Sequence, residues 1–170
     1  YFRYFDDRIA EAITVSGQLT IRWAEQKIND VLNKILKTNK DYVIAIDTDS
    51  LYVDMESFLK KAGMLSKSDN EVCAYLDNVC NQLFEKEFSK TYEELREYTN
   101  CSSQRMEMKR EAIATKGIWT GKKRYVMNVL NNEGVQYAEP KVKVTGIEAV
   151  RSSTPQVCRN WIREGLSLIL

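Results

Sequence analysis

Two aspartates one residue apart are the sharpest candidates for chemistry in this sequence. Asp47 and Asp49 interrupt the apolar residues of the stretch VIAIDTDSLY. Because residues i and i+2 of a strand point to the same face, we expect the two carboxylates to project together. A cation offsets the repulsion between adjacent carboxylates, and Mg²⁺ is the natural choice because it binds a few carboxylates together with water and phosphates. A D-x-D pair is also a common turn former on a protein surface, and that alternative stays open here.

The residue types exclude several other kinds of chemistry. The chain has no histidine, which excludes histidine general bases and histidine-ligated zinc. The net charge of +1 provides no field that would attract nucleic acid to the whole molecule, so a basic site must be local. No apolar run approaches the roughly 20 residues of a membrane span, and no membrane partner is expected. Without a C-x-x-C pair, the cysteines are expected to be reduced, mostly buried thiols of an intracellular protein: Cys73, Cys80, Cys101 and Cys158.

One local cluster of cations stands out in the sequence GKKRY. Lys122, Lys123 and Arg124 would contribute affinity for phosphates without reading base sequence, and Tyr125 would add a flat, rigid surface. The alternative is a basic strand edge that discourages aggregation. Glu111, in KREAIA, would by its residue type alone be an ordinary strand glutamate paired with Lys109 or Arg110.

Helical and hairpin patterns occupy the first hundred residues. Apolar residues recur at a spacing near 3.6 from Phe5 to Leu36, which predicts one long amphipathic helix. YVIAI and LYV flank DTDS, which predicts a β-hairpin with both aspartates at its tip. Further helices are predicted over 54–62 and 70–98.

Strand patterns dominate after Asn100. The stretches RMEMKREAIA, GIWTGKKRYVMNVL and VQYAEPKVKVTGIEAV predict three or four antiparallel strands, and NNEG at 131–134 predicts a tight hairpin. Thr154 as the cap and Pro155 at the first position predict a last helix that runs to Leu170. The expected fold class is therefore α+β, with an antiparallel sheet and long helices in a single domain.

Several blocks resemble the family B DNA polymerases, and the T-even-type bacteriophage branch in particular. DTDSLYV resembles the third polymerase motif of that family, usually written YGDTDS. FRYFDDRIAEAITVSGQ is similar to the segment that follows the family's fingers helix. MKREAIATKGIWTGKKRY, YAEPKVKVTGIE and SSTP resemble its palm strands and the entry to its thumb, in the same order.

The resemblance implies a polymerase palm sheet backed by long helices. Residues 1–38 would be the helix after the fingers, 39–153 the palm sheet and its helices, and 154–170 the start of the thumb, all within one partial domain. It implies two Mg²⁺ ions, with Asp49 as the direct ligand of both and Asp47 shaping the site. Glu111 would be a third acidic residue near the metals, and Lys122, Lys123, Arg124 and Tyr125 would hold the primer strand.

The resemblance also implies partners and a cellular setting. Primer-template DNA, deoxynucleoside triphosphates and the remainder of a polymerase would be the partners, in the cytoplasm of an infected bacterium. The exonuclease domain, the fingers, the first polymerase motif and most of the thumb would lie outside this chain, so we expect it to be an excerpt that is inactive alone. Ala45 and Ile46 replace the family's Tyr-Gly. The alternatives to a polymerase segment are a DNA-binding palm module, a non-catalytic subunit of a split polymerase, or a structural subunit with relic carboxylates.

Overall fold

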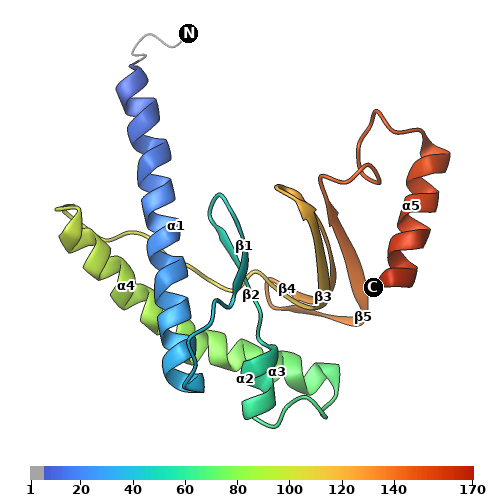
Figure 1. Cartoon of the computed structure of the whole chain (residues 1–170), viewed down its shortest axis with the longest axis horizontal. Coiled ribbons are helices and arrows are strands. Elements are labelled where there is room, and N and C mark those ends of the chain that lie inside the picture. The colour runs from blue at the N-terminus through green and yellow to red at the C-terminus, as the bar shows by residue number, and fades with distance from the viewer. Residues whose placement is uncertain (1–5) are drawn as a thin grey trace. The chain divides into compact units, whose positions relative to one another are not determined.

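The structure is a computed structural model that describes residues 6–170, and it confirms the α+β class (Figure 1). The expected single sheet is in fact two separate antiparallel sheets, one with the order β1-β2 and one with the order β3-β4-β5. The chain divides into two compact units, 1–66 with 81–108 and 67–80 with 109–170. Each unit has its own buried core, and each is built from both helices and strands.

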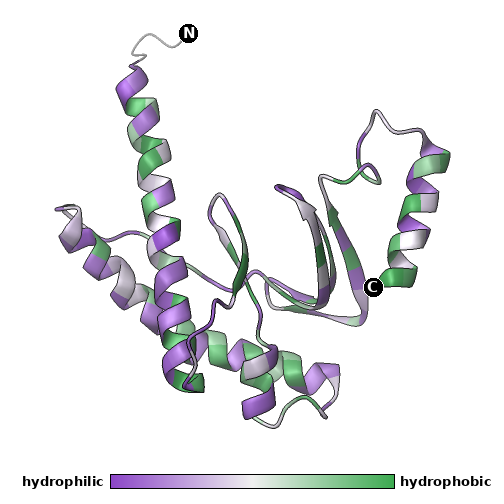
Figure 2. Ribbon diagram, in the orientation of Figure 1, coloured by the Kyte–Doolittle hydropathy of each residue, from purple (hydrophilic) through white to green (hydrophobic). Residues whose placement is uncertain are grey.

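The first unit is organised around α1 (Asp7–Leu36), which packs against α2 (Glu56–Lys61), α4 (Glu85–Tyr98) and the β1-β2 hairpin. The predicted start at Phe5 lies outside the described residues, and Asp6 caps the helix by accepting from the Arg8 N–H. Hydrophilic and hydrophobic residues alternate along α1 (Figure 2). Its buried residues share one face and recur at helical spacing: Ile21, Ala24, Ile28 and Leu32. Ile9 and Ile13, which belong to the predicted apolar pattern, are exposed.

The predicted helix over 70–98 is one helical run with an irregular middle. It consists of α3 (Asp69–Val79), the π-helical turn η1 (Cys80–Phe84) and α4. Ser68 begins α3 with a capping box, in which its side chain accepts from the Glu71 N–H and the Glu71 carboxylate accepts from Ser68. The run passes from the second unit to the first near residue 80, within the π-helical turn.

The second unit contains the sheet of β3 (Ala112–Gly121), β4 (Arg124–Asn132) and β5 (Val135–Thr145). The prediction that residues 105–111 are part of a strand is wrong, because β3 begins only at Ala112. The NNEG hairpin is confirmed: β4 and β5 are joined by Glu133 and Gly134, both at positive φ.

The last helix, α5 (Gln156–Ile169), packs one face on the sheet of the second unit. Pro155, rather than Thr154, is the residue at the N-cap. The apolar cluster beneath α5 combines three buried residues, Val126, Ile147 and Ala149, with half-buried ones from the strands and from the helix: Ile118, Val144, Ile162, Leu166 and Leu170.

The four cysteines are free, but the prediction that most are buried is wrong. Cys73 alone is buried, Cys80 is half-buried, and Cys101 and Cys158 are exposed. Burial raises the pKa of the Cys73 thiol, so this residue packs as a small apolar side chain.

Candidate functional site

The two aspartates lie at the tip of the hairpin formed by β1 (Val43–Asp47) and β2 (Ser50–Val53). Asp47 ends β1 and faces Ser50, while Asp49 lies in the two-residue turn. The two residues are therefore arranged by turn geometry, and the expectation that strand alternation sets their common direction is wrong. Asp47 is half-buried and Asp49 is exposed.

The turn between the aspartates has an unusual backbone. Thr48 has a φ of 55°, and the Asp49 N–H donates to the Asp47 carbonyl at 2.7 Å, which is the hydrogen bond of a γ-turn. A β-branched residue in this region is an outlier that costs roughly 1–3 kcal/mol, and such strain concentrates at functional sites. The Thr48 hydroxyl also donates to Asp47 Oδ1 at 3.2 Å, so the turn holds this carboxylate in place.

Two asparagines of α1 anchor the base of this hairpin. The Asn29 side chain accepts from the Tyr42 N–H and donates to Asp41, each at 2.8 Å. The Asn33 side chain accepts from the Lys40 N–H and donates to the Lys40 carbonyl, again at 2.8 Å. The rigid helix thereby fixes where β1 starts, and the hairpin projects its tip from that anchored base.

A β-bulge adjusts the register before the tip is reached. Val43 pairs with Val53 and Ala45 with Tyr52, so Ile44 is the extra residue, and it is 54% exposed. Ile46, where the resemblance expects glycine, faces Leu51 and is half-buried.

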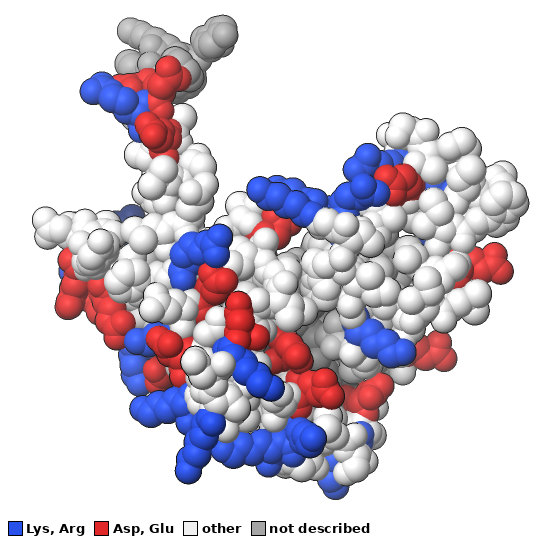
Figure 3. Space-filling model, in the orientation of Figure 1, with Lys and Arg blue, Asp and Glu red and all other residues white. Residues whose placement is uncertain are grey.

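The basic cluster forms the β3-β4 turn of the second unit. Gly121 pairs with Arg124, and exposed Lys122 and Lys123 form the two-residue connection, with Lys123 at a φ of 58°. Basic side chains gather at the end of this unit where the β3-β4 turn and the loop after β5 lie (Figure 3). The geometry therefore presents two lysines at the two-residue turn of a long hairpin, whose strands belong to a three-stranded sheet.

The other two residues of the cluster are engaged within the protein. One guanidinium nitrogen of Arg124 lies 2.7 Å from both carboxylate oxygens of Glu148. Tyr125 is only 8% exposed, and its ring stacks at 6.1 Å on Trp119, the residue opposite it in β3. The Trp119 ring in turn covers Gly117, where a Cβ would come within 2.7 Å of the indole. Tyr125 thus has a rigid support directly behind the turn.

Glu111 precedes β3 and lies in the same unit as the basic turn. Its carboxylate accepts from Lys143 Nζ at 2.7 Å, and this hydrogen bond raises the pKa of Lys143. The carboxylate thus pairs with a residue of β5, while Arg110 donates to the Glu111 backbone carbonyl at 3.3 Å. The Arg110 guanidinium also donates to Asp77 of α3 and to Asn131 of β4, which joins the helix to the sheet.

The candidate residues are divided between the two units. Asp47 and Asp49 belong to the first, while Glu111 and residues 122–125 belong to the second. The role of Glu111 beside the metals stays a prediction. Within residues 6–170, no group of three or more histidine, cysteine or acidic side chains is arranged to hold a metal ion.

Three residues that position the site were not singled out from the sequence. Asn29 and Asn33 lie on the face of an ordinary amphipathic helix, where a sequence pattern carries no signal for an anchor. Gly146, directly after β5, has a φ of 65° and touches the β3-β4 turn. A glycine at a strand end is a sequence signal for a positive φ or a close backbone contact, and this signal was present at Gly146.

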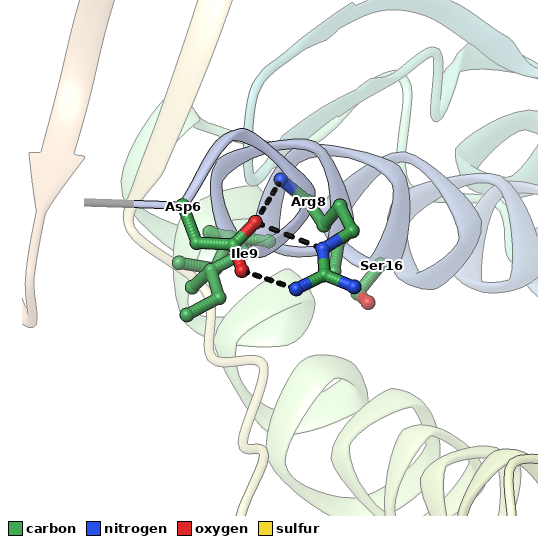
Figure 4. Close-up of a pocket in the computed structure, with 6 residues that line it drawn as sticks. Asp6, Arg8, Ile9 and Ser16 are labelled. Carbon is green, nitrogen blue, oxygen red and sulfur yellow. Dashed lines mark hydrogen bonds and ion pairs between the residues drawn. The ribbon is translucent and has the colours of Figure 1, made fainter. Parts of the chain in front are cut away.

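A shallow hollow at the start of α1 has a simpler explanation than ligand binding (Figure 4). It is lined by residues of this one helix and its cap, and Asp6 accepts there from the Arg8 backbone and guanidinium at 2.7–3.0 Å. The hydrogen bonds from Arg8 hold the pKa of Asp6 below its ordinary value. The hollow reflects helix capping.

Comparison with known proteins relates the chain to polymerases over its whole length. In an alignment of 180 positions covering the full chain, it is 39% identical to the DNA-directed DNA polymerase of Escherichia phage RB69. The corresponding enzyme of Enterobacteria phage T4 is 38% identical over the same length. The chain spans about a fifth of the length of these relatives, since the alignment covers 20% of each. No protein-family model matches the chain.

Over its whole length the chain is thus similar to one segment of the DNA-directed DNA polymerases of T-even-type phages, and it is a fragment of a polymerase of that type. None of the helices within residues 6–170 is both long and apolar enough to cross a bilayer.

Proposed function

We propose that this chain is the palm segment of a family B DNA-directed DNA polymerase that uses two Mg²⁺ ions. The observation that carries the proposal is the DTDS sequence at a hairpin tip, in a chain that is similar to phage polymerases from end to end. Residues 1–38 would follow the fingers, 39–153 would form the palm and 154–170 would begin the thumb. The enzyme would act in the cytoplasm of the infected bacterial host.

The donor chemistry of the hairpin tip suits Mg²⁺. Asp47 and Asp49 offer only carboxylate oxygens, which this ion prefers, and the tip is exposed enough to admit water and phosphates. Two carboxylates are too few for two ions, so we expect the remaining ligands from elsewhere in the polymerase and from the substrate. When bound, the metal pair activates the primer 3′-hydroxyl and stabilises charge on the phosphates.

The two aspartates would have different roles, one as a metal ligand and one in shaping the hairpin tip. Asp49 is exposed in the turn, so its carboxylate is available as the direct ligand. Asp47 accepts from the Thr48 hydroxyl and is half-buried, which suits a residue that shapes the tip. The strained turn and the Asn29 and Asn33 anchors would hold both carboxylates in position before the substrate arrives.

The β3-β4 turn would hold the primer strand. Lys122 and Lys123 present their ammonium groups at the hairpin tip, where they can contact backbone phosphates of any sequence. Tyr125, on its Trp119 support, would fix the turn rather than offer a wide stacking surface. Primer-template DNA and deoxynucleoside triphosphates are therefore the proposed substrates.

Primer extension by a reconstituted enzyme tests catalysis. The chain alone should incorporate no nucleotide, whereas mixing it with a separately expressed upstream portion of the polymerase should restore Mg²⁺-dependent extension. Duplex binding without extension would instead favour the alternative of a DNA-binding palm module or a non-catalytic subunit. Neither binding nor extension would favour a structural subunit.

Salt-dependent duplex binding tests the basic turn. In the complete polymerase, replacing Lys122 and Lys123 with alanine should weaken binding equally for any sequence. The slope of log affinity against log salt should fall by up to about 0.9 for each phosphate that the protein no longer neutralises. A matched control replaces Lys116 of β3 and Lys141 of β5, which removes the same charge from elsewhere on the sheet. Equal effects of the two double variants would remove the turn from the DNA site.

A further inference from the structure

A glycine directly after β5 touches the backbone of the basic turn. Gly146 has a φ of 65°, and a Cβ at this position would lie 1.9 Å from the Lys123 carbonyl oxygen and 3.1 Å from its carbon. Real Cβ atoms essentially never come within 3.0 Å of a neighbour, and here the obstacle is backbone rather than a flexible side chain. Both the left-handed conformation and the close approach therefore require glycine.

The segment that follows Gly146 is itself fixed in place. Ile147 and Ala149 are buried beside Val126 of β4, at 8% and 0% exposure. Arg151 Nε donates to the Gly146 carbonyl at 3.2 Å, and Glu148 accepts from Arg124. Residues 146–151 thus connect the core of the second unit to the β3-β4 turn through backbone, side-chain and apolar contacts.

We propose that Gly146 is a positioning residue for DNA binding: it sets where the Lys122–Lys123 turn lies, and therefore which phosphates the two lysines reach. The inference rests on the proposed role of this turn in primer binding. It assigns to Gly146, a residue without a charge, a role in placing two cations. The ligand chemistry is the phosphate backbone of duplex DNA, held without base specificity.

The test replaces Gly146 with alanine in the complete polymerase and measures duplex affinity across a range of salt. Gly146→Ala leaves every cation in the protein, but we expect weaker binding and a salt slope lower by up to about 1.8, the value for two phosphates that the lysines no longer reach. Gly121→Ala is the matched control, because a Cβ there meets nothing within 4 Å at the edge of the same turn. This control should bind like the unmodified protein.

A double-mutant cycle separates positioning from a general loss of stability. If Gly146 acts through the turn, Gly146→Ala should have no further effect on affinity in a protein that already lacks Lys122 and Lys123. An equal loss in both backgrounds would overturn the inference while leaving the primer-binding role intact. Unchanged affinity after removal of the two lysines would instead overturn both proposals.

A second variant covers the case in which Gly146→Ala does not fold, as judged by its thermal unfolding. Arg151→Lys removes the Nε donor of the hydrogen bond to the Gly146 carbonyl while it keeps the positive charge and introduces no clash. We expect it to lower affinity and salt slope less than Gly146→Ala, and this effect should also vanish without Lys122 and Lys123. A loss that persists in that background would show that Arg151 acts independently of the turn and would overturn the inference.

Discussion

Arg124 of the basic hairpin and Glu148 of the segment after β5 form a close ion pair, in which one guanidinium nitrogen lies 2.7 Å from each carboxylate oxygen. A backbone hydrogen bond, and after it the charge of Arg124, hold the pKa of Glu148 below its ordinary value. Glu148 is therefore ionised at neutral pH and compensates the charge of Arg124. Lys122 and Lys123 are exposed in the same turn.

Neutralising Glu148 should strengthen binding to DNA. In Glu148→Gln, Arg124 loses its counter-charge, so duplex affinity should rise and the salt slope should steepen by up to about 0.9. Salt titrations of duplex binding measure both quantities. Glu139→Gln, at an exposed position of β5, removes the same charge away from Arg124 and is the control. Equal affinities and salt slopes for the two variants would show that Glu148 does not reduce the contribution of Arg124 to DNA binding.

Loss of Asp49 should be far more harmful to extension than loss of Asp47. Removing a direct metal ligand takes away stabilisation of several kcal/mol, so Asp49→Ala should lower the rate at least about a thousandfold. Asp47→Ala should cost roughly tenfold, because it mainly disturbs the tip. Single-turnover primer extension by the complete polymerase measures both, with the exposed Asp30→Ala of α1 as control. Equal losses at 47 and 49 would contradict the division of roles.

Replacing Thr48 with glycine should relieve backbone strain, so that stability is kept or rises while the extension rate falls. Glycine adopts a φ of 55° without the cost of roughly 1–2 kcal/mol that a side chain carries there, although it loses more chain entropy on folding. Thr48→Gly should therefore be as stable as the unmodified protein or up to about 1 kcal/mol more stable. Its extension rate should fall because the tip is less rigid.

Chemical denaturation and primer extension together check the Thr48 prediction. Thr115→Gly, in β3 at an ordinary φ, is the control and should lose stability without a specific effect on the rate. A loss of stability in Thr48→Gly as large as in this control would show that the turn is not strained.

The Glu111–Lys143 pair should make a stabilising contribution that disappears at high pH. The hydrogen bond that Lys143 donates to the Glu111 carboxylate raises the pKa of Lys143 above its ordinary 10.5, so the folded state retains this proton to higher pH than the unfolded chain. The contribution is complete below pH 10.5 and is lost as the pH rises through the raised value. At 38% and 54% exposure, solvent limits it to about 0–1 kcal/mol.

Unfolding of the unmodified protein and of Glu111→Gln should be compared between pH 8 and 11.5. The difference in unfolding free energy should shrink as the pH rises above 10.5, because the unfolded chain loses the Lys143 proton first and the folded state loses it at higher pH. Glu139→Gln again serves as control and should show no such trend. A difference that stays constant with pH would mean that Glu111 acts through packing alone.

Local patterns in the sequence predicted most of the elements and the candidate residues themselves. The helical spacing of α1, the DTDS hairpin and the NNEG hairpin are all confirmed, since each depends on neighbouring residues and on the period of their apolar positions. The residue types at 47, 49 and 122–125 likewise identified carboxylates and cations, whose chemistry does not depend on the fold.

Tertiary structure decided how those residues are held. The pairing of Glu111 with Lys143 and of Arg124 with Glu148 joins positions 32 and 24 residues apart, which no local period can indicate. The β1-β2 hairpin packs on α1 of its own unit and forms a sheet separate from β3-β4-β5, which local patterns do not indicate. Gly146 meets the Lys123 carbonyl only after β4 and β5 have paired, since that pairing brings Tyr125 opposite Thr145. Long-range contacts such as these depend on strand register and packing, and they exist only in the folded chain.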